Sequence, residues 1–205
     1  MVRAAAVLFA GLGAYHLGVR PRLLRWGADG GEVRQAFPGD ARIADPFLVS
    51  TRAVSVAAEP RDIWPWLVQM GDGRGGLYSL DRLDMLFGYL HSPSADVVLP
   101  QYQDLAVGEV IPLGRGPDWP VTIVDREHAL VVEPAGAQIT WCWRIIPTAE
   151  GSARLVSRVR LRLGTRWLLW LLAPAIDLPW FVMEGQMLRG IARRAEGLAS
   201  SRAEN

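Results

Sequence analysis

The chain has 205 residues, of which 50% are hydrophobic and 21% are charged, and its formal net charge is +1. This length fits one domain with some additional chain, and the apolar content excludes a wholly disordered protein. The near-neutral charge argues against a dedicated nucleic-acid binder, which normally carries a basic excess on one face. All 22 basic residues are arginine, so Schiff-base chemistry and a P-loop are excluded because both need a lysine.

Metal and disulfide chemistry have little support in the composition. Cys142 is the only cysteine, and the histidines are His16, His91 and His128. One cysteine cannot form a disulfide, and this set lacks the ligand spacing of a Cys/His zinc site. The G-x-S-x-G elbow of serine hydrolases and the H-E-x-x-H motif of zinc peptidases are also missing. We therefore expect a compact apolar domain with no metal and no cofactor.

Residues 4–19 form an uncharged, apolar run that is flanked by arginines, with Arg3 before it and Arg20, Arg22 and Arg25 after it. A membrane-spanning helix needs about 20 apolar residues, so this run is slightly short. Residues 1–25 therefore form an apolar helix that either anchors the protein to a membrane or packs on the domain, and we favour the anchor. The arginines after the run would keep the main body in the cytoplasm, and a lone free cysteine agrees with a reducing compartment.

The next segments alternate between breaker-rich and periodic sequence. Residues 26–47 mix Gly, Asp and Pro and predict a linker or a wrapping arm. Residues 48–58 are rich in β-branched residues and predict a strand. A helix over 61–70 follows, opened by Pro60, and a second helix over 79–86 has Ser79 as its predicted N-cap.

Five short strands are predicted next, over residues 109–113, 119–126, 129–133, 138–146 and 153–163. The last of them alternates apolar residues with Arg154, Arg158, Arg160 and Arg162. We interpret the arginines as a solvated outer face of an antiparallel sheet rather than an anion-binding stripe. Residues 167–199 have a helical pattern that Pro174 and Pro179 are expected to break, and residues 201–205 are expected to be a disordered tail.

This order of elements predicts an α+β fold, with a curved antiparallel sheet wrapped around a long C-terminal helix and two short helices after the first strand. Such an arrangement leaves a space between helix and sheet. Ligand pockets of this kind are mostly apolar with a few oriented polar groups. Large, adaptable side chains are available to line it, namely Trp141, Trp143, Phe181, Met183 and Met187. The alternative is that these side chains simply fill a dry core.

Three stretches resemble a known superfamily. Residues 64–71 (WPWLVQMG), with 74–76 and 78–81 after them, resemble the N-terminal helical motif of SRPBCC proteins. Residues 181–191 (FVMEGQMLRGI) are similar to the C-terminal grip-helix motif of one bacterial branch, and 101–112 resemble the segment between the two motifs. The superfamily contains START domains, aromatic polyketide cyclases and pollen-allergen-like carriers. The resemblance implies a helix-grip fold over residues 48–200 with a hydrophobic cavity, but no single reaction.

The first motif also supplies candidate polar site residues. Tyr78 can hold a carbonyl or phenolate oxygen inside an apolar space, and Gln69 offers both a donor and an acceptor. Arg74 either orients an anionic head group or ties the loop through Asp72 or Asp81, and we favour the tie. Asp81 either moves a proton or only stabilises the helix dipole. We interpret Asp84, one turn further on, as surface.

Two further residues are candidates for acid–base work. His91 is the histidine best placed for proton transfer near neutral pH, although a lone loop histidine is more often a surface residue. Glu184 lies on the predicted grip helix, where an apolar cavity would raise the pKa of its carboxyl. If Glu184 faces solvent instead, it is an ordinary surface charge.

Three functions then compete. The first is binding of a hydrophobic small molecule, such as a lipid, an isoprenoid or a polyketide-like compound, in the cavity. The second is a cofactor-independent cyclase, dehydratase or isomerase that shapes a polyketide-like substrate there. The third is a membrane-associated interaction protein that uses the N-terminal run and the tryptophan-rich residues 167–180. We favour binding and expect no nucleic-acid partner.

Overall fold

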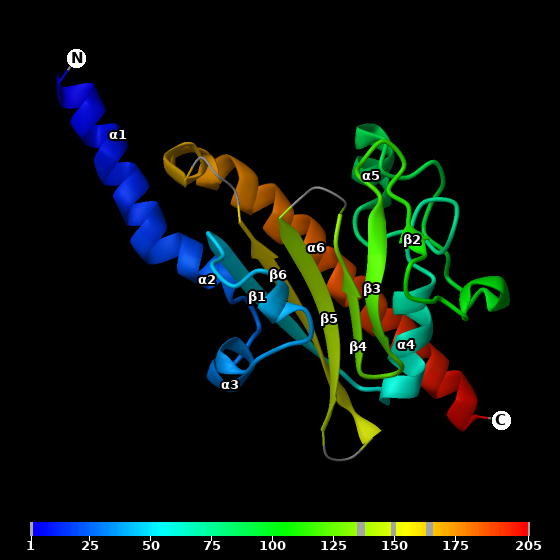
Figure 1. Ribbon diagram of the computed structural model, residues 1–205. Coiled ribbons are helices and arrows are strands. Elements are labelled where there is room, and N and C mark those ends of the chain that lie inside the picture. The colour runs from blue at the N-terminus through cyan, green and yellow to red at the C-terminus, as the bar shows by residue number, and fades with distance from the viewer. Residues whose placement is uncertain (1, 135–137, 149–150, 163–165, 205) are drawn as a thin grey trace.

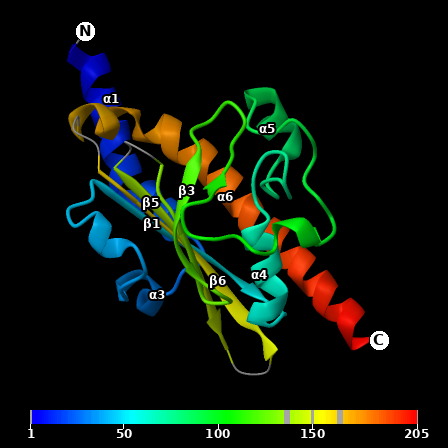
Figure 2. The same ribbon diagram turned by 45° about the vertical axis from the view of Figure 1, so that its right-hand side comes forward.

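The computed structural model describes residues 2–134, 138–148, 151–162 and 166–204. It has an α+β fold in which one antiparallel sheet packs against a long C-terminal helix, as predicted (Figures 1 and 2). Over the described residues the sheet has six strands, in the order β1-β6-β5-β4-β3-β2. The strands are β1 Leu48–Val56, β2 Val110–Ile111, β3 Trp119–Asp125, β4 Ala129–Val132, β5 Ile139–Pro147 and β6 Ala153–Leu161. Residue 163, the last of the predicted sixth strand, lies outside the described residues.

The helices have the expected order, with two of them directly after β1. The N-terminal helices are α1 Val2–Ala14, the π-helical η1 Tyr15–Val19, α2 Arg20–Leu24, α3 Gly30–Arg34 and the short η2 Asp40–Arg42. The remaining helices are α4 Pro60–Val68, α5 Asp81–Phe87, the short η3 Pro100–Tyr102 and α6 Arg166–Ala203. Pro60 occupies a first-turn position of α4, where its missing N–H has no helical partner to lose. This arrangement of strands and helices is the helix-grip fold.

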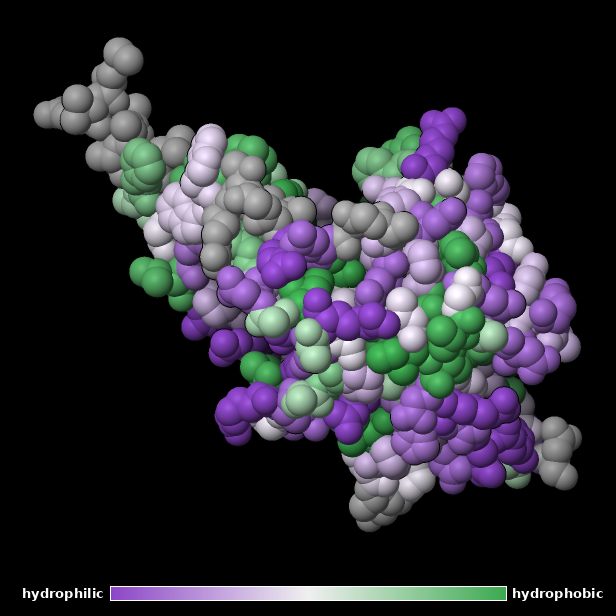
Figure 3. Space-filling view, in the orientation of Figure 1, coloured by the Kyte–Doolittle hydropathy of each residue, from purple (hydrophilic) through white to green (hydrophobic). Residues whose placement is uncertain are grey.

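The N-terminal segment is helical from α1 through α2 and projects from the body of the molecule at the end where α6 begins (Figures 1 and 2). The Tyr15 hydroxyl donates to the Asp177 carboxylate over 2.9 Å, and Arg20 pairs with the same carboxylate. Figure 3 shows hydrophobic residues near the base of this projection. Within the described part of the chain, no helix meets the length and hydropathy needed to cross a membrane.

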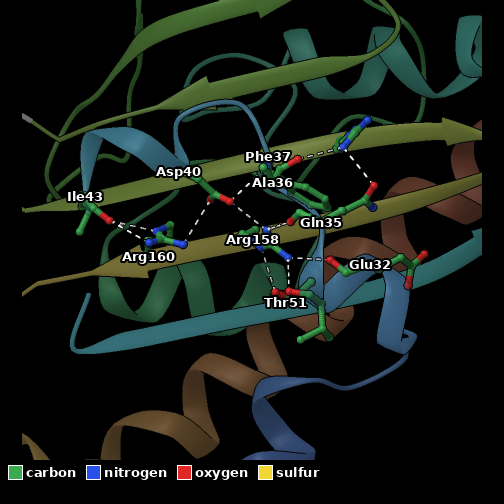
Figure 4. A network of polar contacts seen from close by, with 11 residues as sticks. Glu32, Gln35, Ala36, Phe37, Asp40, Ile43, Thr51, Arg158 and Arg160 are labelled. Atoms are coloured by element: carbon green, nitrogen blue, oxygen red, sulfur yellow. Dashed lines mark hydrogen bonds and ion pairs between the residues drawn. The ribbon is translucent and has the colours of Figure 1, made fainter. Parts of the chain in front are cut away.

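The predicted solvated face of β6 is wrong, because the arginines there hold the arm of residues 26–47 against the sheet (Figure 4). Arg158 is buried and donates to the carbonyls of Glu32, Val33 and Gln35. Its guanidinium lies 3.9 Å from the centroid of the Phe37 ring. Glu32 and Val33 lie in the last turn of α3, where carbonyls have no helical donor, and Gln35 follows that helix. A planar side chain with five donors satisfies several of these carbonyls at once.

Arg158 is supported by its neighbours on the same face of β6. Arg160 donates to the Ile43 carbonyl over 2.9 Å, and Arg154 pairs with Glu32 over 2.8 Å. Asp40 pairs with Arg158 at 3.0 Å. The arm is therefore a wrapping arm that covers the face of the sheet opposite α6.

The predicted break of the C-terminal helix is also wrong, since α6 is continuous from Arg166 to Ala203 through Pro174 and Pro179. A proline removes one N–H from the helical ladder and strands the carbonyl four residues earlier. At Pro174 that carbonyl belongs to Trp170, and it accepts a hydrogen bond from His16 Nε2 over 2.9 Å. An outside donor thus replaces the missing helical bond.

The helix also extends further than expected at its end. Residues 201–203, predicted as part of a disordered tail, belong to α6. Arg202 forms an ion pair with the buried Asp62 of α4, and the Ser201 hydroxyl donates to the Gly197 carbonyl over 3.0 Å. The ion pair with Asp62 holds the last turn against α4, while the Ser201 bond lies within α6.

The two edges of the sheet differ in length. At one edge lies β2, which consists of two residues. At the other lies β1, which has nine residues and pairs on one side only, with β6. The backbone N–H of Ala53 in β1 donates to the Trp26 carbonyl over 3.0 Å. The segment after α2 therefore lies along the open side of β1.

Candidate functional site

The space between the sheet and α6 is apolar and nearly closed by its own side chains. A cavity of about 20 Å³ remains there, which is room for about one water molecule. Its lining comes from the turn after α4, from β2 to β5 with the loop after β2, and from α6. The lining residues are Met70, Leu77, Ile111, Leu113, Trp119, Val132, Trp141, Trp143 and Met187.

Tryptophan rings dominate this space. The Trp141 ring stacks on Trp143 with centroids 4.5 Å apart and meets Trp119 edge-on at 5.3 Å. On its other side it lies 6.1 Å from the Trp180 ring. Trp180 lines a second cavity of about 30 Å³, together with Leu24, Leu48, Ser50, Arg52, Val159, Leu161, Ile176 and Asp177. The contact between Trp141 and Trp180 therefore joins the linings of the two cavities.

The indole N–H groups of these rings are not equally satisfied. Trp141 Nε1 donates to the Ser157 hydroxyl over 2.7 Å. Trp119 Nε1 and Trp143 Nε1 are buried and have no hydrogen-bond partner among the described residues. A buried donor without a partner costs about 1–3 kcal/mol. Trp119 and Trp143 both line the first cavity, so this cost falls on two residues at its border.

Three of the five predicted lining residues border these cavities. Trp141, Trp143 and Met187 line the first cavity. Phe181 instead meets the Trp26 ring edge-on at 5.9 Å, and Met183 is half-buried outside both linings. Phe181 is six positions from Met187, and a regular helix turns by about 100° per residue, so the two side chains leave α6 about 120° apart and do not face the same space.

Glu184 is buried in an ion pair rather than exposed to solvent. Its carboxylate pairs with Arg52, whose side chain is also buried and lines the second cavity. Arg52 Nε donates to the Leu23 carbonyl over 2.9 Å, and Trp180 Nε1 donates to Glu184 Oε2 over 2.7 Å. Glu184 Oε1 is buried without a hydrogen-bond partner among the described residues. The pair thus places one unmatched carboxylate oxygen inside the protein.

Gln69 is fully buried, and three hydrogen bonds join it to the loop over residues 97–103. Its Oε1 accepts from the Leu99 N–H over 2.9 Å and from Gln103 Nε2 over 3.1 Å. Its Nε2 donates to the Val97 carbonyl over 3.2 Å. A buried amide is costly unless it is hydrogen-bonded, and these bonds to the loop meet that requirement.

Tyr78 lies at the contact between the first motif and α6. It has a positive φ of 57°, which is uncommon for a residue with a side chain. Its carbonyl lies so close to Gly190 of α6 that a Cβ added there would be 2.0 Å from the oxygen. The phenol is buried, its hydroxyl has no partner of normal geometry among the described residues, and burial raises the pKa of Tyr78 despite the nearby Gln69, Arg194 and Arg74.

Asp81 and Asp84 both lie on α5 and accept hydrogen bonds from serines outside that helix. Asp81 accepts from the Ser94 hydroxyl over 2.6 Å and from the Ser94 N–H over 3.0 Å. Asp84 is buried, which corrects its interpretation as surface, and it accepts a hydrogen bond from the Ser79 hydroxyl. The prediction that Ser79 is the N-cap of α5 is wrong, because Leu80 occupies that position and the Ser79 hydroxyl donates to Asp84 instead. Burial raises the pKa of Asp84, Ser79 opposes this, and Asp81 reinforces it.

His91 forms an exposed pair with Asp72. Its Nδ1 lies 2.5 Å from Asp72 Oδ2, and its backbone N–H donates to Oδ1 over 2.8 Å. The His91 side chain is 74% exposed. Burial would raise the pKa of Asp72, but the contacts with His91 outweigh it and lower that pKa.

Arg74 ties its own loop, although through a different partner from those expected. It donates to the Val68 carbonyl over 2.9 Å, and its guanidinium lies 4.5 Å from the centroid of the Tyr102 ring. Around it, residues 71–76 (GDGRGG) have the G-x-G-x-x-G spacing of a dinucleotide fingerprint. That fingerprint follows a strand, whereas this turn follows α4 and is closed by backbone bonds between Gly71 and Gly76.

The structure brings some candidates together and leaves others apart. Tyr78 and Asp81 share Ser94, whose hydroxyl also accepts from the Tyr78 N–H over 2.9 Å. Gln69 borders the Tyr78 hydroxyl, because a Cβ at Gly75 would lie 2.4 Å from that hydroxyl and 2.8 Å from Gln69 Nε2. No recorded contact joins His91 or Glu184 to this group within the described residues.

Two residues of the interior do not figure in the sequence-based prediction. Trp119 precedes Val121 by two positions on β3, so the period of a strand could have placed both on the inner face. Arg52 is a single charge within the otherwise uncharged β1. A lone charge in an apolar strand requires a buried partner, but the sequence does not say that the partner is Glu184.

A wider groove lies outside the sheet–helix space, beside the open edge of β1. It has a volume of about 470 Å³ and is lined by Trp26, Gly27, Ala53, Val54, Ser55, Arg154, Arg189, Ala192 and Arg193. The Arg189 guanidinium lies 4.5 Å from the centroid of the Trp26 ring. Among the described residues, no cluster of three or more His, Cys, Asp or Glu side chains is arranged to hold a metal ion.

Proteins similar to this chain are found among solved structures, at low sequence identity. No protein-family model and no curated protein matches it. KanY protein, solved in solution, matches at 12% identity and a TM-score of 0.46, over 73% of this chain and 97% of that one. Norcoclaurine synthase from Thalictrum flavum matches at 17% identity and 0.43, over 78% and 92%. CalU16 from Micromonospora echinospora matches at 11% identity and 0.36, over 74% and 86%. The structural neighbours are SRPBCC helix-grip proteins.

Proposed function

We propose that the protein binds a small apolar molecule that carries a hydrogen-bond-accepting oxygen, in the space between the sheet and α6. The observation that carries this proposal is the pair of buried indole N–H groups of Trp119 and Trp143 without an acceptor. A carbonyl, hydroxyl or ether oxygen on a guest would satisfy one or both. The apolar lining would bind the rest of the guest.

Binding requires side chains to move, because the two cavities hold only about 20 and 30 Å³. Met70 and Met187 are unbranched and adapt readily. A rotation of the Trp141 and Trp180 rings, which touch each other between the cavities, would merge the two spaces. The expected guest is a lipid, an isoprenoid or a polyketide-like molecule that occupies the space from which these rings move. The resemblance of the two motifs to SRPBCC proteins agrees with such a use of the fold.

A matched pair of probes tests the proposal. The compounds 2-acetylnaphthalene and 2-ethylnaphthalene have nearly the same shape, and only the first has an oxygen acceptor. We expect the ketone to bind the full chain more tightly, by about fivefold for one hydrogen bond of about 1 kcal/mol. Trp143→Phe and Trp119→Phe remove the donors and should reduce this preference. Trp167→Phe, at a position that is 70% exposed, is the control and should leave it unchanged.

Extraction of the purified protein into organic solvent, followed by mass spectrometry, provides an independent readout. An apolar oxygen-containing compound should copurify. If no compound copurifies and neither naphthalene binds, the proposal is wrong. Equal affinity for the two probes would show that the unpaired N–H groups do not recognise an oxygen.

A second candidate function is a cofactor-independent cyclase, dehydratase or isomerase. It is favoured by Glu184 Oε1 and the Tyr78 hydroxyl, which are both buried without a partner among the described residues. Glu184 would move a proton and Tyr78 would polarise a carbonyl, with Gln69, Asp81 and His91 as further candidates. A linear poly-β-ketone thioester tests this. Turnover to a ring product that falls by orders of magnitude in Tyr78→Phe and Glu184→Gln supports catalysis, and no turnover by the unmodified chain excludes it for this substrate class.

A further inference from the structure

The N-terminal projection and the first half of α6 form one end of the molecule, which we call the helical tip (residues 2–25 and 166–183). Large apolar side chains on the tip are exposed, with Leu17 at 86% and Trp167 at 70%. Phe9 and Leu172 are exposed as well. Figures 1 and 2 show that both helices lie at the same end, with α1 reaching beyond the sheet. Apolar side chains of this size on a continuous end mark an interaction surface.

The charge of the tip is strongly one-sided. The tip contains five arginines and one acidic residue, Asp177, whereas the rest of the chain has 17 arginines and 20 acidic residues. Asp177 is buried and already paired with Arg20 at 2.6 Å. Arg22 and Arg25 are exposed. The tip therefore combines an apolar surface with uncompensated positive charge, while the body has a small negative excess.

We propose that the helical tip docks on an anionic lipid surface without crossing it. Helices that lie in a membrane interface have apolar side chains on one side and arginines or lysines that bind anionic head groups. Tryptophan is favoured at that depth, and Trp167 is the most exposed tryptophan described. The net negative body would be repelled by the same lipids, which would orient the molecule with the tip toward the surface.

A second copy of the chain fits this surface less well. In a symmetric dimer, one tip would contact the same tip of its partner. Each tip exposes Arg22 and Arg25, and its Asp177 is already paired with Arg20. Two such surfaces would bring like charges together with no opposite charge between them. Anionic head groups provide the missing countercharge.

The tip is also held firmly enough to orient the body. His16 Nε2 donates to the Trp170 carbonyl over 2.9 Å, and the two rings stack at 4.4 Å. The Tyr15 hydroxyl and Arg20 both bind Asp177. These contacts join η1 and α2 to α6, so docking of the tip would fix the position of the domain above the lipid.

Cosedimentation of the full chain with vesicles tests the charge requirement. We expect it to sediment with phosphatidylcholine vesicles that contain phosphatidylglycerol and much less with phosphatidylcholine alone. Replacing both exposed arginines (Arg22→Gln with Arg25→Gln) should weaken binding to the anionic vesicles by about 30-fold, since each arginine near the surface contributes a roughly fivefold factor. The matched control, Arg82→Gln with Arg115→Gln on the body, should leave binding unchanged.

A second pair of variants tests the apolar contact. Phe9→Ser with Leu17→Ser should reduce vesicle binding by at least about tenfold. Leu86→Ser with Phe87→Ser on α5, where the side chains are similarly exposed, should not. Lipids brominated along the acyl chain should quench part of the tryptophan fluorescence, and Trp167→Phe should remove that part.

Three results would overturn the proposal. The first is a full chain that sediments with neither kind of vesicle. The second is an equal loss of binding in the tip variants and the body controls. The third is a dimer in sedimentation velocity that Phe9→Ser with Leu17→Ser converts to a monomer, because that would assign the tip to a second copy. Circular dichroism of each variant shows whether it is folded, so that a loss of binding through unfolding is not counted among these results.

Discussion

His16 Nε2 donates a hydrogen bond over 2.9 Å to the carbonyl of Trp170, the group that Pro174 leaves without its helical donor. The imidazole also stacks on the Trp170 ring at 4.4 Å and 6°. The two residues are 154 positions apart in the chain. The N-terminal segment therefore supplies the hydrogen bond that α6 lacks at Pro174.

This relationship predicts that the effects of His16 and Pro174 are coupled. His16→Ala removes a hydrogen bond and a ring contact and should lower the free energy of unfolding by about 1–2 kcal/mol. Pro174→Ala restores the helical N–H, so the same His16→Ala change should have a smaller effect in that background. Denaturant unfolding of the four chains gives the coupling. Equal losses from His16→Ala in both backgrounds would mean that the carbonyl of Trp170 does not need this donor.

The buried pair of Arg52 and Glu184 predicts a strong asymmetry between single and double changes. Glu184→Leu leaves the Arg52 guanidinium buried without its partner and should lower the free energy of unfolding by about 3–5 kcal/mol. Arg52→Met in the same chain removes the stranded charge and should restore most of this loss. Thermal or denaturant unfolding measures both. A double variant as unstable as the single one would show that the loss does not come from the unpaired charge of Arg52.

Gly190 should not tolerate a side chain. A Cβ there would lie 2.0 Å from the Tyr78 carbonyl oxygen, so α6 and the first motif would have to separate. Gly190→Ala should reduce the free energy of unfolding by about 2 kcal/mol or more. Gly197 of the same helix has no atom within 4 Å of an added Cβ. Gly197→Ala should therefore stabilise the protein by about 0.5–1 kcal/mol through helix propensity alone.

Two carboxyls predict pH dependences of opposite sign. Burial raises the pKa of folded Asp84 above its unfolded value of about 3.9. Its contribution to stability is therefore full below that pH and is lost as the pH rises through the folded pKa. Contacts with His91 lower the pKa of Asp72, so its contribution is present above about pH 3.9 and is lost as the pH falls through the folded pKa.

The two corresponding variants make this measurable. Relative to the unmodified chain, Asp84→Asn should become more stable as the pH rises from about 4. The deficit of Asp72→Asn at neutral pH should shrink on acidification. Denaturant unfolding at several pH values gives both differences, and slopes of the same sign would contradict the two assignments.

The order of helices and strands could be predicted from the sequence, because each of these elements depends on the local pattern of apolar residues. The strand over 48–58, the two helices after it and the later strands all follow from periodicity and breakers. The arm and α6 were less predictable, since their outcome depends on distant donors. Arg158 covers the carbonyls of the arm, and His16 repairs the helix at Pro174. Neither contact can be inferred from spacing, because it joins segments more than 100 residues apart.

The candidate site was predictable in composition and less so in arrangement. Trp141, Trp143 and Met187 line the space between sheet and helix, as the strand and helix periods suggest. How completely their rings fill that space depends on rotamers that a sequence does not specify. The unpaired N–H groups of Trp119 and Trp143 are likewise visible only once all neighbours are placed.

The unequal edges of the sheet bear on how the protein behaves at high concentration. Open strand edges recruit strands from other molecules and start aggregation. Here β2 is too brief to serve as a template, and on the far side the Trp26 carbonyl already occupies the Ala53 amide. Removing residues 1–28 would free the Ala53 amide on the open edge of the nine-residue β1, so the truncated chain should form intermolecular β-structure that the full chain resists.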